Sequence, residues 1–588
     1  MATRVPGLFV FLRLLVLFLW VLPAPCNAVS RIDIHIGEID HPSGGVENLS
    51  ASMTPDGRWQ GKATLKQADL ALLSKEIPLP VAVTKGMASG SAEFSGSGTT
   101  PYRVKSDLAL RDIAFSDEAG LHAGEKIGGT LHVDASQADA PGGAWQWQLA
   151  LNWRDGEVFW QPLYLAAGHS FKAQGTWSPA QLHLQQGTVQ LDGIGTLALQ
   201  GDLKLPEKSV SNLSLSGHGL QAGKGYEVLA KPFLEKTMLG NLETAGSIDI
   251  DAELRDGQLK AFTLGLNSLD IEDKGGRFAL YKVNANVPWA LNGATRANLQ
   301  FGSGRALRLA LGESNLTARL EGWSLVAQEW NIPVLDGVIS LQDVSAALLN
   351  GQWHGHFAAR LAPISMPEFS HAVGWPRMEG KLAASIPLVT YSAGAMTMDG
   401  NMQFDVFDGR ITVGKLTLDQ ALGLAPRLKA DIEMRNLDLG LLTSTFSFGD
   451  MKGRLDGNVL GMELSSWKPV KFDASFRSSP GNYPRKISQR AVENISALGG
   501  AGAAAAIQRS FLRFLNEFNY AKIGLSCRLR NDICTMGGVE PAASGYVIVK
   551  GSGIPAITVL GYNRSVSWKE LLERVQRITA GNAKPIIK

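Results

Sequence analysis

An alternation of apolar and polar side chains with period two runs through most of the chain and constrains its fold more than any other feature. Ile32, Ile34 and Ile36 alternate with Asp33 and His35 near its start. A strand places successive side chains on opposite faces of its sheet, so this alternation indicates one dry face and one wet face. Parallel strands that are covered on both faces would show continuous apolar runs instead. The pattern therefore predicts a mainly β protein built from antiparallel strands.

Turn dipeptides separate the alternating segments. Asp-Gly occurs eight times and Asn-Gly twice, and both tolerate the positive φ angles of tight hairpin turns. Together they predict a long antiparallel meander from about residue 30 to residue 480, and no Pro-rich linker, charge block or strict repeat divides it. Helical signals are few and span residues 226–239, 487–498, 503–518 and 568–579, the third of which has an apolar face at helical period. Ser567 and Glu570 form a capping box before the last of these.

The dry faces of such a long sheet must close into a barrel, pair in a sandwich or curl around something apolar. A concave apolar face would hold hydrocarbon chains, at about 0.8 kcal/mol for each methylene kept from water. The alternative is that these side chains only pack on one another. The candidate lining residues are Trp145, Trp147, Leu149, Leu151, Trp153, Ile248, Ile250, Leu254, Met402, Phe404, Val406, Ile432 and Met434.

The N-terminal segment has the organisation of a secretion signal. Arg4 precedes an apolar stretch at residues 8–22 that is interrupted by Arg13. A membrane-spanning helix needs about 20 residues, so the stretch is short for an anchor and suits the apolar core of a signal peptide. Small residues permit cleavage after Ala28. The alternative is an uncleaved anchor that tilts in the bilayer or thins it.

Two cysteines, Cys527 and Cys534, would remain after that cleavage. They bracket a predicted hairpin turn, and in an oxidising compartment such a pair is expected to form a disulfide. Two free buried thiols are the alternative. His354 and His356 would lie on one face of a strand, but no third ligand is near them in the sequence, so we expect no metal site.

The charge balance and the motifs exclude several classes of function. Lys and Arg number 56 and Asp and Glu 54, which gives no reason to expect a nucleic-acid partner. The chain lacks a nucleophile elbow, a zinc-protease motif and a P-loop. Residues 500–505 match a dinucleotide motif by letters but follow a predicted helix instead of a strand. We therefore expect no catalytic residues and no cofactor. A carboxylate pair for glycoside hydrolysis stays open, because such pairs are distant in sequence.

The C-terminal third resembles a known family. Residues 448–457 (FGDMKGRLDG), 462–470 (MELSSWKPV), 486–492 (KISQRAV) and 523–529 (IGLSCRL) carry the resemblance, which spans roughly residues 440–580. They resemble the C-terminal portion of the AsmA-like proteins, nearest to the YdbH branch. The resemblance implies an elongated, twisted β-groove in the periplasm of a Gram-negative envelope that moves phospholipids between the inner and outer membranes. A dicarboxylate-transport label is also attached to this region, but a long apolar groove does not suit a small dianion.

Residues and resemblance together give one expected organisation: a signal peptide or weak anchor at residues 1–28, a β-groove at 29–485 and a C-terminal region with helices and a bridged hairpin at 486–588. The expected function is non-enzymatic, with phospholipids and either membrane or its proteins as partners. The expected location is the periplasm, free or anchored to the inner membrane. One alternative is a scaffold for outer-membrane proteins that uses exposed strand edges. Another is a carbohydrate-active β-fold enzyme.

Overall fold

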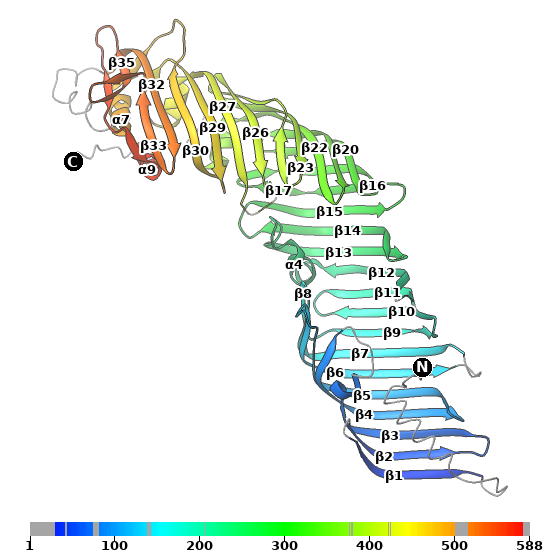
Figure 1. The fold of residues 1–588 in the computed structure, drawn as a ribbon. Helices are drawn as coiled ribbons and strands as arrows, with labels where there is room; N and C mark the ends of the chain where they lie inside the picture. The colour runs from blue at the N-terminus through cyan, green and yellow to red at the C-terminus, as the bar shows by residue number, and fades with distance from the viewer. Residues whose placement is uncertain are drawn as a thin grey trace. The chain divides into compact units, whose positions relative to one another are not determined.

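A computed structural model (Figure 1) describes residues 30–579 except 42–43, 75–80, 138–142, 206, 208, 375–376, 378–379, 422, 424 and 500–515. The protein is mainly β, with 70% strand and 10% helix, in one long antiparallel sheet of many strands. The predicted fold class, a long antiparallel meander with few short helices, is confirmed. The predicted signal segment with its cleavage position Ala28 lies outside the described residues.

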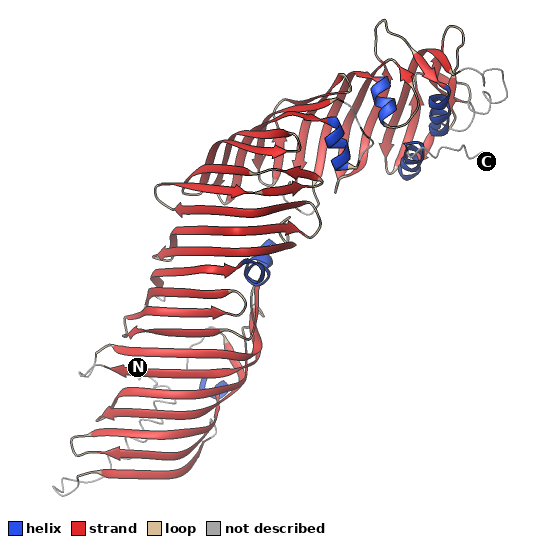
Figure 2. Ribbon diagram, turned by 180° about the vertical axis from the view of Figure 1, so that it is seen from behind, coloured by secondary structure: helices blue, strands red, loops and turns tan. Residues whose placement is uncertain are grey.

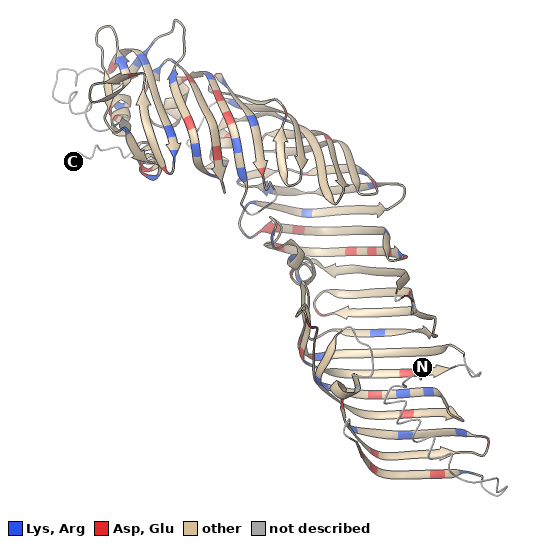
Figure 3. Cartoon of the chain, in the orientation of Figure 1, with Lys and Arg blue, Asp and Glu red and all other residues tan. Residues whose placement is uncertain are grey.

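The chain divides into two compact units. The first comprises Met1–Glu235, Glu243–Asp270 and Asn284–Gly293, and the second comprises Lys236–Leu242, Ile271–Val283 and Ala294–Lys588. In each unit, basic and acidic residues are interspersed along the strands (Figure 3).

Where the structure describes it, the first unit is a meander of long strands with four short helical segments. Its strands before residue 236 are β1 (Ile32–His41), β2 (Gly44–Met53), β3 (Arg58–Asp69), β4 (Ala82–Ser97), β5 (Thr100–Ser116), β6 (His122–Gln137), β7 (Trp145–Trp160), β8 (Leu163–Ala166), β9 (Ser170–Trp177), β10 (Gln181–Leu191), β11 (Gly195–Lys204) and β12 (Ser209–Gln221). Its helical segments are α2 (Leu70–Leu73), α3 (Ala222–Gly225), η2 (Tyr226–Ala230) and α4 (Lys231–Leu234). The residues of β13 (Leu242–Arg255), β14 (Gln258–Asp273) and β15 (Phe278–Ala290) are shared between the two units.

The described residues of the second unit also form a meander of strands, with four helices. Its strands are β16 (Ala294–Phe301), β17 (Ser303–Ala306), β18 (Leu309–Leu311), β19 (Ser314–Glu321), β20 (Ser324–Val334), β21 (Gly337–Leu349), β22 (Gln352–Ser365), β23 (Lys381–Ser392), β24 (Ala395–Met398), β25 (Asn401–Val406), β26 (Gly409–Asp419), β27 (Arg427–Asp438), β28 (Met451–Lys452), β29 (Arg454–Ser465), β30 (Lys468–Ser478), β31 (Lys486–Ser488), β32 (Glu517–Arg530), β33 (Ile533–Gly538), β34 (Glu540–Ala542), β35 (Gly545–Gly551), β36 (Val559–Gly561) and β37 (Ser565–Ser567). Its helices are α5 (Met366–Val373), α6 (Leu439–Thr445), α7 (Gln489–Gly499) and α9 (Trp568–Thr579), visible in Figure 2.

Two of the four helix predictions are confirmed. The helix predicted at 568–579 is α9, and the Ser567 hydroxyl accepts a hydrogen bond from the Glu570 N–H (3.2 Å) as its cap. The helix predicted at 487–498 is α7, but its first residue is Gln489. The prediction at 226–239 is wrong at both ends, because the helical segments run from Ala222 to Leu234. The prediction at 503–518 falls largely outside the described residues, and Phe518 lies in β32.

Most of the Asp-Gly and Asn-Gly dipeptides lie at hairpin turns as predicted. At Asn350–Gly351, between β21 and β22, both residues have positive φ (50° and 76°). Two predicted turns are wrong, because Asp155 lies inside β7 and Asp456 lies inside β29. The register between β6 and β7 shifts beside Asp155, so this dipeptide forms a bulge instead of a turn.

The two units differ in how their apolar side chains are covered. In the second unit a large core surrounds Ile487, Phe518 and Leu529, each fully buried. In the first unit a small cluster gathers around Ile194, and most large apolar side chains on the strands are only half-buried. The strands therefore have an apolar face in both units, but a large packed core covers that face mainly in the second unit.

Candidate functional site: an apolar strip and an apolar pocket

Three rows of mainly apolar residues cross nine strands of the first unit, from β4 to β13, on one face of the sheet. Each row follows the cross-strand register from residue to residue. The first row is Gly90, Leu108, Leu131, Leu151, Phe171, Val189, Leu197, Gly217 and Ile250. The second is Ala92, Ser106, Val133, Leu149, Ala173, Gly187, Leu199, Leu215 and Ala252. The third is Phe94, Val104, Ala135, Trp147, Gly175, Leu184, Gly201, Leu213 and Leu254. We call these three rows the apolar strip.

The dimensions of the apolar strip follow from strand geometry. Neighbouring strands lie about 4.8 Å apart, so the eight spacings between nine strands give a length of about 40 Å. Adjacent rows are two residues apart on each strand, except at the register shift between Leu184 and Gly187 of β10, so three rows are about 13 Å wide. The strip is therefore a continuous apolar surface much longer than it is wide.

Large side chains of the strip approach glycines of the neighbouring strand closely. The ring of Phe94 covers Gly61 of β3, where an added Cβ would collide with it. The Trp147 ring covers Gly175, with its Cζ2 atom 3.1 Å from the position of an added Cβ. The Trp147 Nε1 atom is buried without a hydrogen-bond partner, so this side chain contributes only hydrocarbon to the strip. Glycine in a strand often marks such a close approach, and here the missing Cβ leaves room for the aromatic rings.

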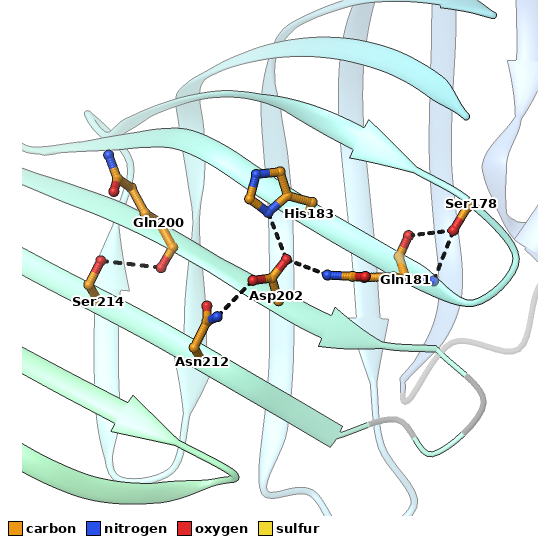
Figure 4. A network of polar contacts seen from close by, with 7 residues as sticks. All are labelled: Ser178, Gln181, His183, Gln200, Asp202, Asn212 and Ser214. Atoms are coloured by element: carbon orange, nitrogen blue, oxygen red, sulfur yellow. Dashed lines mark hydrogen bonds and ion pairs between the residues drawn. The ribbon is translucent and has the colours of Figure 1, made fainter. Parts of the chain in front are cut away.

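The opposite face of the same strands is polar. Figure 4 shows Asp202 of β11 accepting hydrogen bonds from His183 Nδ1 (2.6 Å), Gln181 Nε2 (2.5 Å) and Asn212 Nδ2 (2.7 Å). Desolvation raises the pKa of Asp202, but these hydrogen bonds outweigh it and hold the pKa below its usual value. The polar groups of this face are therefore satisfied by one another and by solvent, and the two faces are cleanly segregated.

The candidates predicted on β7 and β13 lie in or beside the apolar strip. Trp147, Leu149 and Leu151 belong to its three rows, as do Ile250 and Leu254. All five side chains are half-buried.

The other candidates of the first unit lie at the margins of the strip. Trp145 pairs with Trp177, one step outside the third row. Trp153 packs edge-on against His169, with 5.5 Å between ring centroids. Ile248 pairs with Leu220 of the small buried cluster.

The candidates of the second unit lie on a comparable surface. The register aligns one row there, Phe404, Ile411, Met434, Gly457, Phe476 and Leu525, from β25 to β32. Met402 and Ile432 lie on the next row, joined through Val413. These candidates are half-buried except Val406, which is 8% exposed and belongs to the core.

An apolar pocket of about 470 Å³ lies in the second unit, between strands of the sheet and helices α6, α7 and α9. It is lined by Leu439, Leu442, Thr443, Phe446, Phe448, Met451, Leu455, Phe476, Ile495, Leu498, Ile523, Gly524, Leu525, Ile548 and Val575. The sequence reasoning did not find this pocket. One sequence signal for a helix beside the pocket was present: Asp is a preferred N-cap residue, and Asp438 caps α6 by accepting a hydrogen bond from the Leu441 N–H (3.0 Å).

The predicted disulfide between Cys527 and Cys534 is confirmed, with 5.3 Å between the two Cα atoms. His354 and His356 instead lie within hydrogen-bond distance of the Ser392 and Ser345 hydroxyls (3.1 and 2.8 Å from Nδ1). No group of three potential metal ligands occurs in the part of the chain that the structure describes.

No protein-family model matches the chain, and no curated protein sequence matches it. Across residues 30–579, with the gaps given above, no helix has the length and apolar character needed to cross a bilayer.

Proposed function

We propose that this protein is a non-enzymatic component of a bacterial envelope whose apolar strip carries or shields the acyl chains of phospholipids. The observation that carries the proposal is the continuity of the strip: three rows of half-buried apolar residues across nine strands, backed by a hydrogen-bonded polar face. A surface of this kind is unusual on a soluble protein, because large exposed apolar patches mark binding sites. The resemblance of residues 440–580 to the AsmA-like proteins supports the same function.

The dimensions of the strip suit hydrocarbon chains. One acyl chain spans half of a bilayer core of about 30 Å, or about 15 Å, so a strip of about 40 Å holds two to three chains end to end. Each methylene kept from water contributes about 0.8 kcal/mol. Because the contacts are numerous and similar, no single position would trap a chain, and a lipid would move along the strip by small steps.

The proposed location is the periplasm, with one or both membranes, or their proteins, as partners. The Cys527–Cys534 disulfide supports an oxidising compartment. The N-terminal segment would direct secretion or hold the protein at the inner membrane, as its sequence predicts.

A paired substitution on β7 tests the proposal. Leu149→Asp with Leu151→Asp places two carboxylates in the strip, and Gln148→Asp with Asn152→Asp is the control on the opposite face of the same strand. Pressing a carboxylate against hydrocarbon costs several kcal/mol, and about 1.4 kcal/mol is a tenfold change in affinity. We expect the strip variant to lose at least about tenfold of the phospholipid recovered with the purified protein, and the control to keep it.

Lipid extraction and native mass spectrometry give the measurement, with circular dichroism to show that both variants are folded. Wild-type protein that carries no lipid, or a strip variant that carries as much as the wild type, would contradict the proposal. A stoichiometric protein partner recovered without lipid would favour a scaffold instead.

A further inference from the structure

We infer that the apolar pocket of the second unit is a binding site for one hydrocarbon chain of a membrane phospholipid, whose headgroup stays outside. The inference rests on the proposed function and adds to it a discrete site of limited capacity. The strip extends over nine strands, whereas the pocket is a local hollow lined by the sheet and three helices. A chain on the strip would slide, and a chain in the pocket would be held.

The volume of the pocket selects a single chain. Its 470 Å³ falls within the range of about 300 to 1,000 Å³ that is usual for small-molecule sites. A methylene group is close in size to a water molecule, which occupies about 30 Å³ in the liquid. The pocket therefore takes roughly 15 carbon atoms, which matches one acyl chain and leaves no room for a second.

The lining excludes a headgroup. Thr443 is the one polar side chain among the lining residues, and its hydroxyl donates a hydrogen bond to the Leu439 carbonyl (2.6 Å). Among the described residues that line the pocket none is charged, so a phosphate placed inside would lose its hydration without compensation from them. A hydrocarbon chain makes no such demand.

The pocket continues the apolar row of the second unit. Phe476 and Leu525 are the last two members of that row and also line the pocket. The row reaches them through Met434 and Gly457, where the Phe476 ring lies over the glycine with its Cδ1 atom 2.8 Å from the position of an added Cβ. A chain that moves along the row therefore reaches the pocket without crossing a polar residue.

Helix α9 forms the accessible side of the pocket. Val575 is 38% exposed and is the most exposed of the lining residues, whereas Leu439, Met451 and Ile548 are at most 4% exposed. The chain end would lie deep among the buried residues, and the headgroup would emerge near α9.

Two neighbouring leucines of α6 give a matched pair of variants. Leu442 is half-buried and lines the pocket, whereas Leu441 is 38% exposed and does not. Leu442→Trp fills the pocket, and Leu441→Trp adds the same ring to the same helix outside it. The probe is a phosphatidylcholine with a photoreactive group at the end of one acyl chain, presented in phosphatidylcholine vesicles, and crosslinked peptides are identified by mass spectrometry.

We expect wild-type crosslinks in peptides of the first unit's strip and in peptides that line the pocket. Leu442→Trp should reduce the pocket crosslinks at least about tenfold and leave the strip crosslinks unchanged, and Leu441→Trp should change neither. Strip crosslinks without pocket crosslinks, or pocket crosslinks that survive in Leu442→Trp, would overturn the inference and leave the proposed function standing. An absence of crosslinks anywhere would overturn both.

A chain-length series that compares unmodified protein with Leu442→Trp gives a second test, because both proteins share the strip and differ only in the pocket. Alkylphosphocholines of about 8 to 18 carbons have one chain each, and 0.8 kcal/mol per methylene corresponds to about a fourfold gain in affinity per carbon. We expect the binding that Leu442→Trp loses to show this gain up to about 15 carbons and no further, because longer chains no longer fit the pocket. A gain that continues to the longest chain, or binding independent of length, would contradict a bounded pocket. A cavity filled by another part of the protein would also give no dependence on chain length.

Discussion

The pair of Asp273 and Arg277 at the end of β14 allows a quantitative prediction of stability. Asp273 is 1% exposed and accepts hydrogen bonds from Arg277 through Nε (2.9 Å), Nη2 (2.7 Å) and the backbone N–H (2.9 Å). The same guanidinium donates to the Met238 carbonyl (2.9 Å). These bonds tie two segments of the second unit together through one buried carboxylate.

The hydrogen bonds from Arg277 lower the pKa of Asp273 from its ordinary 3.8 to about 2, although desolvation opposes them. One pKa unit is about 1.4 kcal/mol, so the difference corresponds to about 2 kcal/mol. Because the Arg277 side chain is 39% exposed, solvent screening reduces the contribution to between about 1 and 2 kcal/mol. The folded-state pKa lies below the unfolded one, so this stability is present above about pH 4 and disappears as the pH falls through 2.

Asp273→Asn should therefore lower the free energy of unfolding by about 1 to 2 kcal/mol at pH 7, and about half of this difference should remain at pH 3. Urea unfolding at the two pH values gives the measurement, with hydrogen exchange of peptides from 271–283 as the local readout. Asp405→Asn is the control, because the Asp405–Arg410 pair is exposed on both sides and should leave the unfolding midpoint unchanged. A destabilisation of Asp273→Asn that is equal at pH 7 and pH 3 would refute the electrostatic reasoning.

Two further predictions concern packing and the disulfide. Cys534 is fully buried, and its disulfide joins two residues that are seven positions apart. Cys534→Ser removes this crosslink and should lower the free energy of unfolding by about 2 to 3 kcal/mol, measured by urea denaturation. Free thiols at Cys527 and Cys534 in non-reducing mass mapping would contradict this prediction. Gly96→Ala places a Cβ against the ring of Trp59, which is 6% exposed, and should cost about 1 to 3 kcal/mol. Gly37→Ala is its control, since an added Cβ there meets nothing within 4 Å, and equal melting temperatures for the two variants would show that the Trp59 ring moves freely.

The faces of the strands could be predicted from the sequence because alternation is a local property. Trp147, Leu149 and Leu151 share a face wherever their strand pairs, and the structure places them in adjacent rows. The position of a β-bulge is not a local property, because it depends on how a strand pairs with its neighbour. Asp456 was predicted in a turn from its Asp-Gly dipeptide, but its carboxylate accepts hydrogen bonds from the Asn436 N–H (2.9 Å) and the Ser479 hydroxyl (2.6 Å). Asn436 and Ser479 belong to other segments of the chain, and no residue pattern around Asp456 predicts these contacts.

The pocket could not be predicted from the sequence for a related reason, namely that its lining residues are far apart in the chain. Its lining comes from three helices, five strands and the residues after α6, which are separated by up to 136 positions between Leu439 and Val575. Helix α6 has only seven residues, too few to show an apolar face at helical period. Its cap residue Asp438 is the one local signal, and a single Asp predicts a helix start only when a periodic segment follows.

The same alternation thus leads to two different interiors, and the difference depends on what covers the dry face. In the second unit, α6, α7 and α9 lie over the sheet, and a core forms around residues such as Ile487 and Leu529. On the strip of the first unit most residues of the apolar rows stay half-buried, and the Trp147 ring approaches Gly175 of the neighbouring strand closely. An apolar face that is half-buried costs free energy unless a ligand covers it. Acyl chains would cover it along its whole length, and this is why the proposed function and the stability of the first unit should depend on the same bound lipid.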